Sequence, residues 1–193
     1  MRRLLAAALV LGFASTAVAQ PESAYYGLAL GSFDYQEEAS PGFSGFGDTT
    51  DSWRLMVGYQ LLEYLMVEGG IGKTSVIKDS ETFTDPTSGP VTVNFNTEFQ
   101  SLMIRMLGVK NFDSGLTVLG GIGWAEMNQD VDITFSVPGV APASGDQDIG
   151  EPTYYAGVQY DLERFAVRLA FEKYDFSGGV DVEETTVTFF YKL

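Results

Sequence analysis

One stretch, from Ser52 to Thr74, limits the possible folds of this chain more than any other: SWRLMVGYQLLEYLMVEGGIGKT. Apolar residues recur at every second position on both sides of a short break at residues 61–64, which predicts two strands joined by a tight turn. One predicted face carries Trp53, Leu55, Val57, Tyr59, Leu65, Val67 and Ile71, and the other carries Arg54, Met56, Gly58, Gln60, Met66, Glu68, Gly70 and Gly72.

The two faces of this hairpin do not suit a water-soluble sheet, which buries its apolar face and wets its polar one. The apolar face is large, free of charge and aromatic at its ends. The opposite face mixes glycines with single charges of both signs. This arrangement favours a barrel that has lipid outside and a polar filling inside.

The N-terminus has the parts of a secretory signal peptide of bacterial type. Arg2 and Arg3 supply a positive start, residues 4–13 an apolar run, and residues 17–19 (AVA) a small-residue cleavage site. A membrane-spanning helix needs about 20 apolar residues, and neither this run nor any later one reaches that length. We therefore predict a signal peptide over residues 1–19 and one barrel domain over residues 20–193.

Composition excludes several classes of protein. The chain has no cysteine, so it can form neither a disulfide nor a thiolate zinc site. It also lacks the cysteine to which the lipid of a lipoprotein is attached. Without Arg2 and Arg3 it has 9 basic residues against 26 acidic ones. Such an excess of negative charge argues against binding to nucleic acid or to an anionic surface through bulk charge.

Six further segments complete an alternating pattern along the chain. They are residues 24–35, 98–108, 116–126, 154–160, 165–174 and 185–193, and Trp124 is left without an assigned facing. Predicted loops at 36–51, 75–94, 128–152 and 175–184 alternate with tight turns at 61–64, 110–115 and 161–164. Residues 131–137 in the longest loop also alternate, so two alternatives stay open there: the strand at 116–126 continues, or a small hairpin stands above the membrane. Long loops on one side and short turns on the other are typical of outer-membrane barrels. The prediction is an all-β fold, an eight-stranded antiparallel up-and-down transmembrane β-barrel.

Three strings, WRLMVGYQLLEYLMVEGGIG, FAVRLAFEKYDF and TTVTFFYKL, resemble the small eight-stranded outer membrane barrels of the OmpA/OmpX type, without a peptidoglycan-binding domain. The resemblance implies a bacterial outer-membrane location, with outer-membrane lipid and lipopolysaccharide as neighbours. It also implies that the barrel-assembly machinery recognises the C-terminal strand, Thr185 to Leu193. The final residue of that signal is usually Phe in the family, whereas this chain ends in Leu193 with Phe189 and Tyr191 before it.

The candidate site is a set of charges on the predicted inward face: Arg54, Glu68, Arg105, Arg168, Glu172 and Lys192. An eight-stranded barrel is just wide enough for its side chains to fill, so enclosed charges must pair with one another or with water. One interpretation is a structural plug. The other is a narrow water-filled path, since inward glycines at 58, 70 and 72 would leave room for water.

Enzyme chemistry finds little support in these residues. Barrel enzymes of similar size generally use a histidine base, and the chain has no histidine. Gly72-Lys73-Thr74 matches the end of a P-loop, but Val67 stands where the first glycine belongs. We expect no catalytic residues, no cofactor and no dedicated metal site.

Acidic residues gather in the predicted loops, where a solvated surface is the main interpretation and divalent cations are the alternative. Asn128, Asp130 and Asp132 have the spacing of a calcium loop, but Ile133 occupies the position of its turning glycine. The other loop acids are Glu37, Glu38, Asp48, Asp51, Asp79, Glu81, Asp85, Asp146, Asp148, Glu151, Asp181, Glu183 and Glu184.

The predicted function is that of an integral outer-membrane surface protein with a structural or interaction role. The alternative is a narrow pore or carrier for ions or small apolar solutes. A secreted soluble barrel with a ligand inside would need an apolar interior, which the facing of the hairpin argues against.

Overall fold

The computed structural model describes residues 24–37, 46–85, 89–137, 139–176 and 180–193. The predicted signal peptide lies outside these residues. Nine antiparallel strands are present in the described part: β1 (Ala24–Glu37), β2 (Phe46–Leu62), β3 (Leu65–Thr74), β4 (Ile77–Asp85), β5 (Gly89–Asn111), β6 (Leu116–Phe135), β7 (Ala143–Leu162), β8 (Phe165–Tyr174) and β9 (Val180–Lys192). No helix there is long and apolar enough to cross a membrane.

The strands close into a ring of eight. Their order is β3-β2-β1-β9-β8-β7-β6-β5-β4, and an additional pairing of β3 with β5 joins the two ends. Both β3 and β4 pair with β5, one after the other, so together they serve as a single barrel strand. The predicted eight-stranded antiparallel barrel is therefore confirmed.

A bulge separates β3 from β4. Lys73 pairs with Gln100, while Ile77 pairs with Thr97, so the chain has one extra residue on its own side of the ladder. The inward positions consequently change from even numbers, such as Thr74, to odd numbers, such as Ile77. An added residue of this kind bends a strand and increases its twist.

Side chains alternate across the wall as the sequence predicts. On β8, Leu169 is 57% exposed and its neighbour Arg168 is fully buried. Trp124, which the sequence left unassigned, points outward and is 48% exposed. The predicted turn of the first hairpin falls at residues 63–64. The outer surface of the wall is thus a belt of large apolar side chains, and the interior holds the charges.

Three predicted loops are wrong in part, because strands occupy much of them. β2 begins at Phe46, and β4 and the start of β5 fill most of residues 75–94. β6 continues to Phe135, which confirms the alternative that this strand extends into the predicted loop, and β7 begins at Ala143. Prolines in these segments suggested loops, but Pro90 and Pro142 lie close to the hairpin turns, where a missing N–H is tolerated. The last strand likewise begins at Val180 rather than at residue 185.

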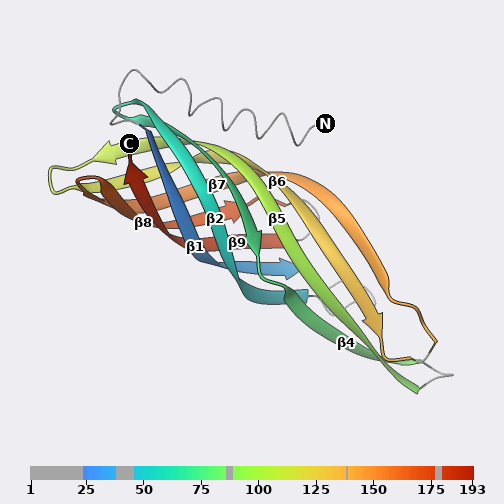
Figure 1. The fold of residues 1–193 in the computed structure, drawn as a ribbon. Coiled ribbons are helices and arrows are strands. Elements are labelled where there is room, and N and C mark those ends of the chain that lie inside the picture. Colours follow the sequence, from blue (N-terminus) through green and yellow to red (C-terminus); the bar gives the residue numbers. More distant parts are fainter. Residues whose placement is uncertain (1–23, 38–45, 86–88, 138, 177–179) are drawn as a thin grey trace.

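These additional strand residues form a protrusion, here called the extension: residues 77–85, 89–97, 127–135 and 143–151. Figure 1 shows β4, β5, β6 and β7 continuing well past the end of β1. The tight turns and the C-terminus lie at the opposite end of the barrel, here called the turn end. The extension and the turn end provide the two reference points for the interior.

Candidate functional site

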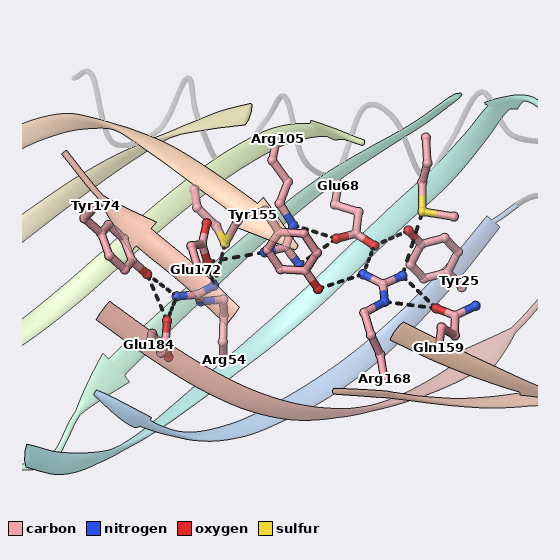
Figure 2. A network of polar contacts seen from close by, with 12 residues as sticks. Tyr25, Arg54, Glu68, Arg105, Tyr155, Gln159, Arg168, Glu172, Tyr174 and Glu184 are labelled. Carbon is pink, nitrogen blue, oxygen red and sulfur yellow. Dashed lines mark hydrogen bonds and ion pairs between the residues drawn. The ribbon is translucent and has the colours of Figure 1, made fainter. Parts of the chain in front are cut away.

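Charged side chains from five strands fill the barrel interior (Figure 2). They come from β2, β3, β5, β8 and β9, and each is at most 4% exposed. The set consists of three arginines and three glutamates: Arg54, Arg105, Arg168, Glu68, Glu172 and Glu184. Inward alternation on neighbouring strands brings these residues to the axis, where we call them, with their polar partners, the charge ladder.

Glu68 is the centre of the half nearer the turn end. Its Oε2 lies 2.6 Å from Nη2 of Arg105, and its Oε1 lies 2.6 Å from Nη1 of Arg168. The hydroxyl of Tyr25 donates a hydrogen bond to the same Oε1. Both carboxylate oxygens therefore have charged partners, which a buried carboxylate requires if it is to remain ionised.

Arg105 links this half to the other one. Its Nη1 lies 3.3 Å from Oε2 of Glu172, which also accepts a 2.7 Å hydrogen bond from Nη1 of Arg54. Nη2 of Arg54 donates to Glu184, whose Oε2 also accepts a 2.9 Å hydrogen bond from the hydroxyl of Tyr174. The guanidinium groups thus act as bridges between successive carboxylates along the axis.

The ladder continues from Arg168 to the turn end through one neutral side chain, Gln159, and then a partly exposed ion pair. Arg168 donates from Nε and Nη2 to Oε1 of Gln159, at 3.0 and 2.8 Å. Nε2 of Gln159 donates to Asp161 at 2.9 Å, and Nζ of Lys192 lies 2.6 Å from the same Oδ1. The side chain of Lys192 is 30% exposed. Lys192 therefore ends the ladder at the barrel mouth and has no direct contact with the buried charges.

Charge balance and aromatic contacts reduce the cost of burying these ions. The buried set is formally neutral, because its arginines and glutamates are equal in number. Arg105 lies over the ring of Tyr155 at 3.7 Å, and Arg168 lies over the ring of Phe190 at 4.4 Å. Cations over aromatic faces are stabilised by the ring quadrupole. The arrangement leaves each arginine with partners on several sides.

An apolar layer covers the ladder on the side of the extension. Phe99 lies 5.4 Å from both Phe33 and Tyr35, and Phe33 lies 6.1 Å from Tyr174, measured between ring centroids. Ile77, Met127 and Val182, all at most 2% exposed, complete this aromatic cap. The interior is thus filled by two successive layers, one charged and one apolar.

The inward glycines do not leave the space that the sequence suggested. An added Cβ at Gly58 would lie 2.2 Å from the ring of Tyr25, and one at Gly70 would lie 2.6 Å from the sulfur of Met56. At Gly72 it would lie 2.8 Å from the carbonyl oxygen of Trp53. Neighbouring atoms, rather than room for water, therefore occupy these positions, and that expectation is wrong.

Sequence reasoning placed all six candidates on the inward face, but it missed several partners. Glu184 was assigned to an external loop, and the structure corrects this, since Glu184 is 2% exposed inside the barrel. Its spacing from Thr186 and Thr188 was the available signal, because β9 begins earlier than predicted. The other missed partners are Tyr25, Tyr155, Gln159 and Tyr174.

Among the residues that the structure describes, no three acidic side chains are grouped so that they could hold a metal ion. Asn128 instead donates to Asp148 at 2.9 Å on the exposed face of the extension. At the rim of the wall, Lys173 pairs with Asp181 and Glu183 at 2.8 and 3.2 Å, and Lys73 pairs with Glu98 at 2.8 Å. These exposed pairs are screened by solvent and contribute little to stability.

Comparison with known proteins agrees with this geometry. A family model described as "Outer membrane protein beta-barrel domain" matches residues 4–192. No curated protein matches the chain in sequence.

Among solved structures, Neisserial surface protein A is similar over 88% of this chain and 97% of its own, with a TM-score of 0.62 and 12% identity. Ail, the attachment invasion locus protein of Yersinia pestis, in complex with the heparin analogue sucrose octasulfate, is similar over 89% and 99%, with a TM-score of 0.56 and 12% identity. OprG from Pseudomonas aeruginosa is similar over 89% and 97%, with a TM-score of 0.51 and 15% identity. At these identities the likeness shows the fold alone.

Proposed function

Since the chain belongs to the outer membrane protein β-barrel domain family, we propose that it is a closed surface barrel with a structural or interaction role. The protein resides in the bacterial outer membrane. In such barrels the short turns are periplasmic and the longer connections external. By this rule the turn end faces the periplasm and the extension stands outside the cell.

The filled interior is the observation that carries the proposal. Arg54, Arg105 and Arg168 are at most 4% exposed and reach carboxylates on facing strands. An ion that crossed the barrel would have to separate several buried pairs, and breaking one buried pair typically costs about 3–5 kcal/mol. The aromatic cap adds a second packed layer, made mainly of rings and aliphatic side chains. This supports a barrel that stays closed.

The alternative function, a narrow pore or carrier for ions or small apolar solutes, lacks an observation in its favour. Passage of an apolar solute would require it to cross the charge ladder, and passage of an ion would require it to cross the aromatic cap. An enzymatic role is also disfavoured, because no histidine is present and each buried carboxylate is held by an arginine.

The neighbours of the wall follow from its outer surface. Side chains such as Leu55, Ile104 and Leu169, 46–57% exposed, would contact the lipid chains. Lipopolysaccharide would lie against the rim that carries Lys73 and Lys173, with divalent cations as the alternative partners of the carboxylates there. On β9, Val187 and Phe189 face outward at 39% and 55% exposure, which suits recognition of residues 185–193 by the barrel-assembly machinery.

The ligand bound to Ail differs in charge from what the surface of this protein would attract. That protein was solved with a heparin analogue, a sulfated and therefore anionic molecule. This chain carries a formal net charge of −15, and its extension carries eight acidic residues and one basic one. A surface of this sign repels polyanions. We therefore assign the external surface of this protein to partners other than sulfated sugars.

Single-channel recording in planar bilayers tests the closed barrel. Purified protein should insert without discrete conductance steps, because both layers of the interior remain in place. Insertion is verified in parallel by heat-modifiable migration of the same preparation on a gel. Reproducible steps from protein that migrates as the folded form would overturn the proposal in favour of the pore.

A further inference from the structure

The extension turns an apolar surface toward the barrel axis. Phe83 on β4 is 50% exposed, whereas its cross-strand partner Val91 and the next inward residue, Val93, are buried at 5% and 7% exposure. The continuous pairing of β5 with β6 places further apolar residues on the same face. We call this surface the inner stripe: Phe83, Val91, Val93, Phe95, Val131, Ile133 and Phe135.

The strands on the other side of the barrel end below the inner stripe. Tyr35 of β1 packs against Phe99 at the base of the extension, and β1 ends at Glu37. β5, by contrast, continues from Thr97 to Gly89 beside β4 and β6 (Figure 1). Beyond the end of β1, β5 pairs with β4 and β6, and β6 pairs with β7. The stripe is therefore the face of a sheet that stands above the capped barrel.

Carboxylates lie alongside the stripe on the same face. Asp79 is the cross-strand partner of Phe95, and Glu81 is the partner of Val93. Directly paired residues of antiparallel strands have Cβ atoms roughly 4.5–5.5 Å apart and on the same side of the sheet. The extension as a whole has eight acidic residues and one basic residue, Lys78. Four of the acidic residues, Asp130, Asp132, Asp146 and Asp148, lie on the opposite face of the sheet. The stripe thus combines apolar area with nearby carboxylates on an extension of negative net charge.

Building on the proposed interaction role, we propose that the inner stripe binds a cationic amphipathic peptide segment. Apolar side chains of the peptide cover Phe95 and Ile133, and its basic side chains pair with Asp79. Charge complementarity selects this occupant, because a polyanion is repelled and a second copy of this chain carries the same negative extension. A neutral apolar molecule would leave the carboxylates without a role in recognition.

Fluorescence anisotropy of a labelled 18-residue Lys/Leu amphipathic peptide tests the proposal. The full-length protein is placed in phosphatidylcholine nanodiscs, and empty nanodiscs provide the baseline. A peptide in which every Lys is replaced by Glu keeps the apolar pattern and reverses the charge. Binding should be specific to the Lys/Leu peptide and should weaken as salt is raised, since exposed charges are screened within about 10 Å at 0.1 M salt.

Two variants assign the binding to the stripe. Phe95→Ser with Ile133→Ser should weaken binding at least about tenfold, because two apolar contacts are lost. Asp79→Asn should weaken it by a smaller factor and reduce its dependence on salt. The matched control, Asn94→Ser with Thr134→Ser, changes the opposite face of the same two strands and should bind as the parent does. Heat-modifiable migration verifies that each variant keeps its folded barrel.

Equal binding of the Glu/Leu peptide, or equal loss in the control pair, would overturn the proposal, as would absence of binding by the parent protein. Self-association that is lost in the Phe95→Ser, Ile133→Ser variant would assign the stripe to a second copy and would also overturn it. These outcomes are independent of the conductance measurement. Failure of the peptide to bind would not contradict the closed barrel, and conductance steps would not contradict the peptide site.

Discussion

The barrel wall and the extension share a period of two along their strands but place their apolar side chains on opposite sides. In the wall, Leu169 points outward at 57% exposure while Arg168 is buried inside. In the extension, Val93 points inward at 7% exposure while Asn94 faces outward and is exposed. We attribute this sidedness to the solvent, because in our proposal lipid surrounds the wall and water surrounds the extension.

One strand, β5, contains both arrangements. Its pairing with β6 is continuous from Val93 and Phe135 to Asn111 and Thr117, so no slip of register separates the two halves. Odd-numbered residues face inward throughout: Arg105 in the wall and Phe95 in the extension. The change of sidedness therefore comes from residue choice alone. A strand can pass from membrane to water without a change in which residues point inward. Its inward side chains then change from polar to apolar, and its outward side chains change from apolar to polar.

The largest effect is expected from the interior of the wall. Glu68→Gln removes the charge that neutralises Arg105 and Arg168, and leaving a buried charge uncompensated typically costs about 3–5 kcal/mol of unfolding free energy. Urea unfolding in lipid vesicles, followed by intrinsic fluorescence, measures this. Glu183→Gln, which loosens an exposed pair with Lys173, is the control and should leave the unfolding free energy unchanged. Equal effects of the two variants would contradict the claim that the charge ladder stabilises the barrel.

The second prediction contrasts the two outward faces directly. Leu169→Arg places a charge near the middle of β8, where lipid contact should cost about 2–4 kcal/mol. Thr134→Arg places the same charge on the outward face of the extension and should leave stability unchanged, since water surrounds it. The same unfolding experiment compares both variants. A large loss of unfolding free energy in Thr134→Arg would place the extension in the membrane. It would then contradict the difference in surroundings between the wall and the extension.

Packing around Tyr25 gives a smaller effect. A Cβ at Gly58 would lie 2.2 Å from the Tyr25 ring, which is fixed by Glu68 and by an edge contact with Phe190 at 5.0 Å. Overpacking of this kind typically costs about 1–3 kcal/mol, so Gly58→Ala should lower stability by that amount. Gly108→Ala, whose Cβ would meet nothing closer than 3.5 Å, is the control. A neutral Gly58→Ala would show that the interior has free space.

The smallest effect is expected from calcium at the acidic extension. Its carboxylates are solvated in our account, so millimolar calcium should leave the thermal melting temperature unchanged. Magnesium at the same concentration controls for general screening. A calcium-specific rise in melting temperature would instead support the divalent-cation alternative, and substitution of Asp130 and Asp132 by Asn would then test the site.

Much of the wall could be predicted from the sequence, because lipid contact requires an apolar residue at every second position. Leu55, Ile104 and Leu169 are examples of such outward residues. The extension was predicted only in part, as the alternative that residues 131–137 continue a strand or form a hairpin. Its outward face is polar, as loops are, and prolines mark its turns. The partners within each ion pair could not be predicted from the sequence either. The contact of Glu68 with Arg168 joins residues 100 apart, and only the closed ring and its register bring them together.

Spin-label accessibility in nanodiscs tests the central claim, the exchange of polarity along β5 and its neighbours, most directly. The chain has no cysteine, so single cysteines can be introduced at positions 104 and 169 in the wall and at positions 94 and 134 in the extension. The account predicts that labels at 104 and 169 collide mainly with oxygen, which partitions into lipid, and that those at 94 and 134 collide mainly with a water-soluble nickel chelate. Contact with the nickel chelate at 169, or oxygen-dominated collisions at 134, would contradict it.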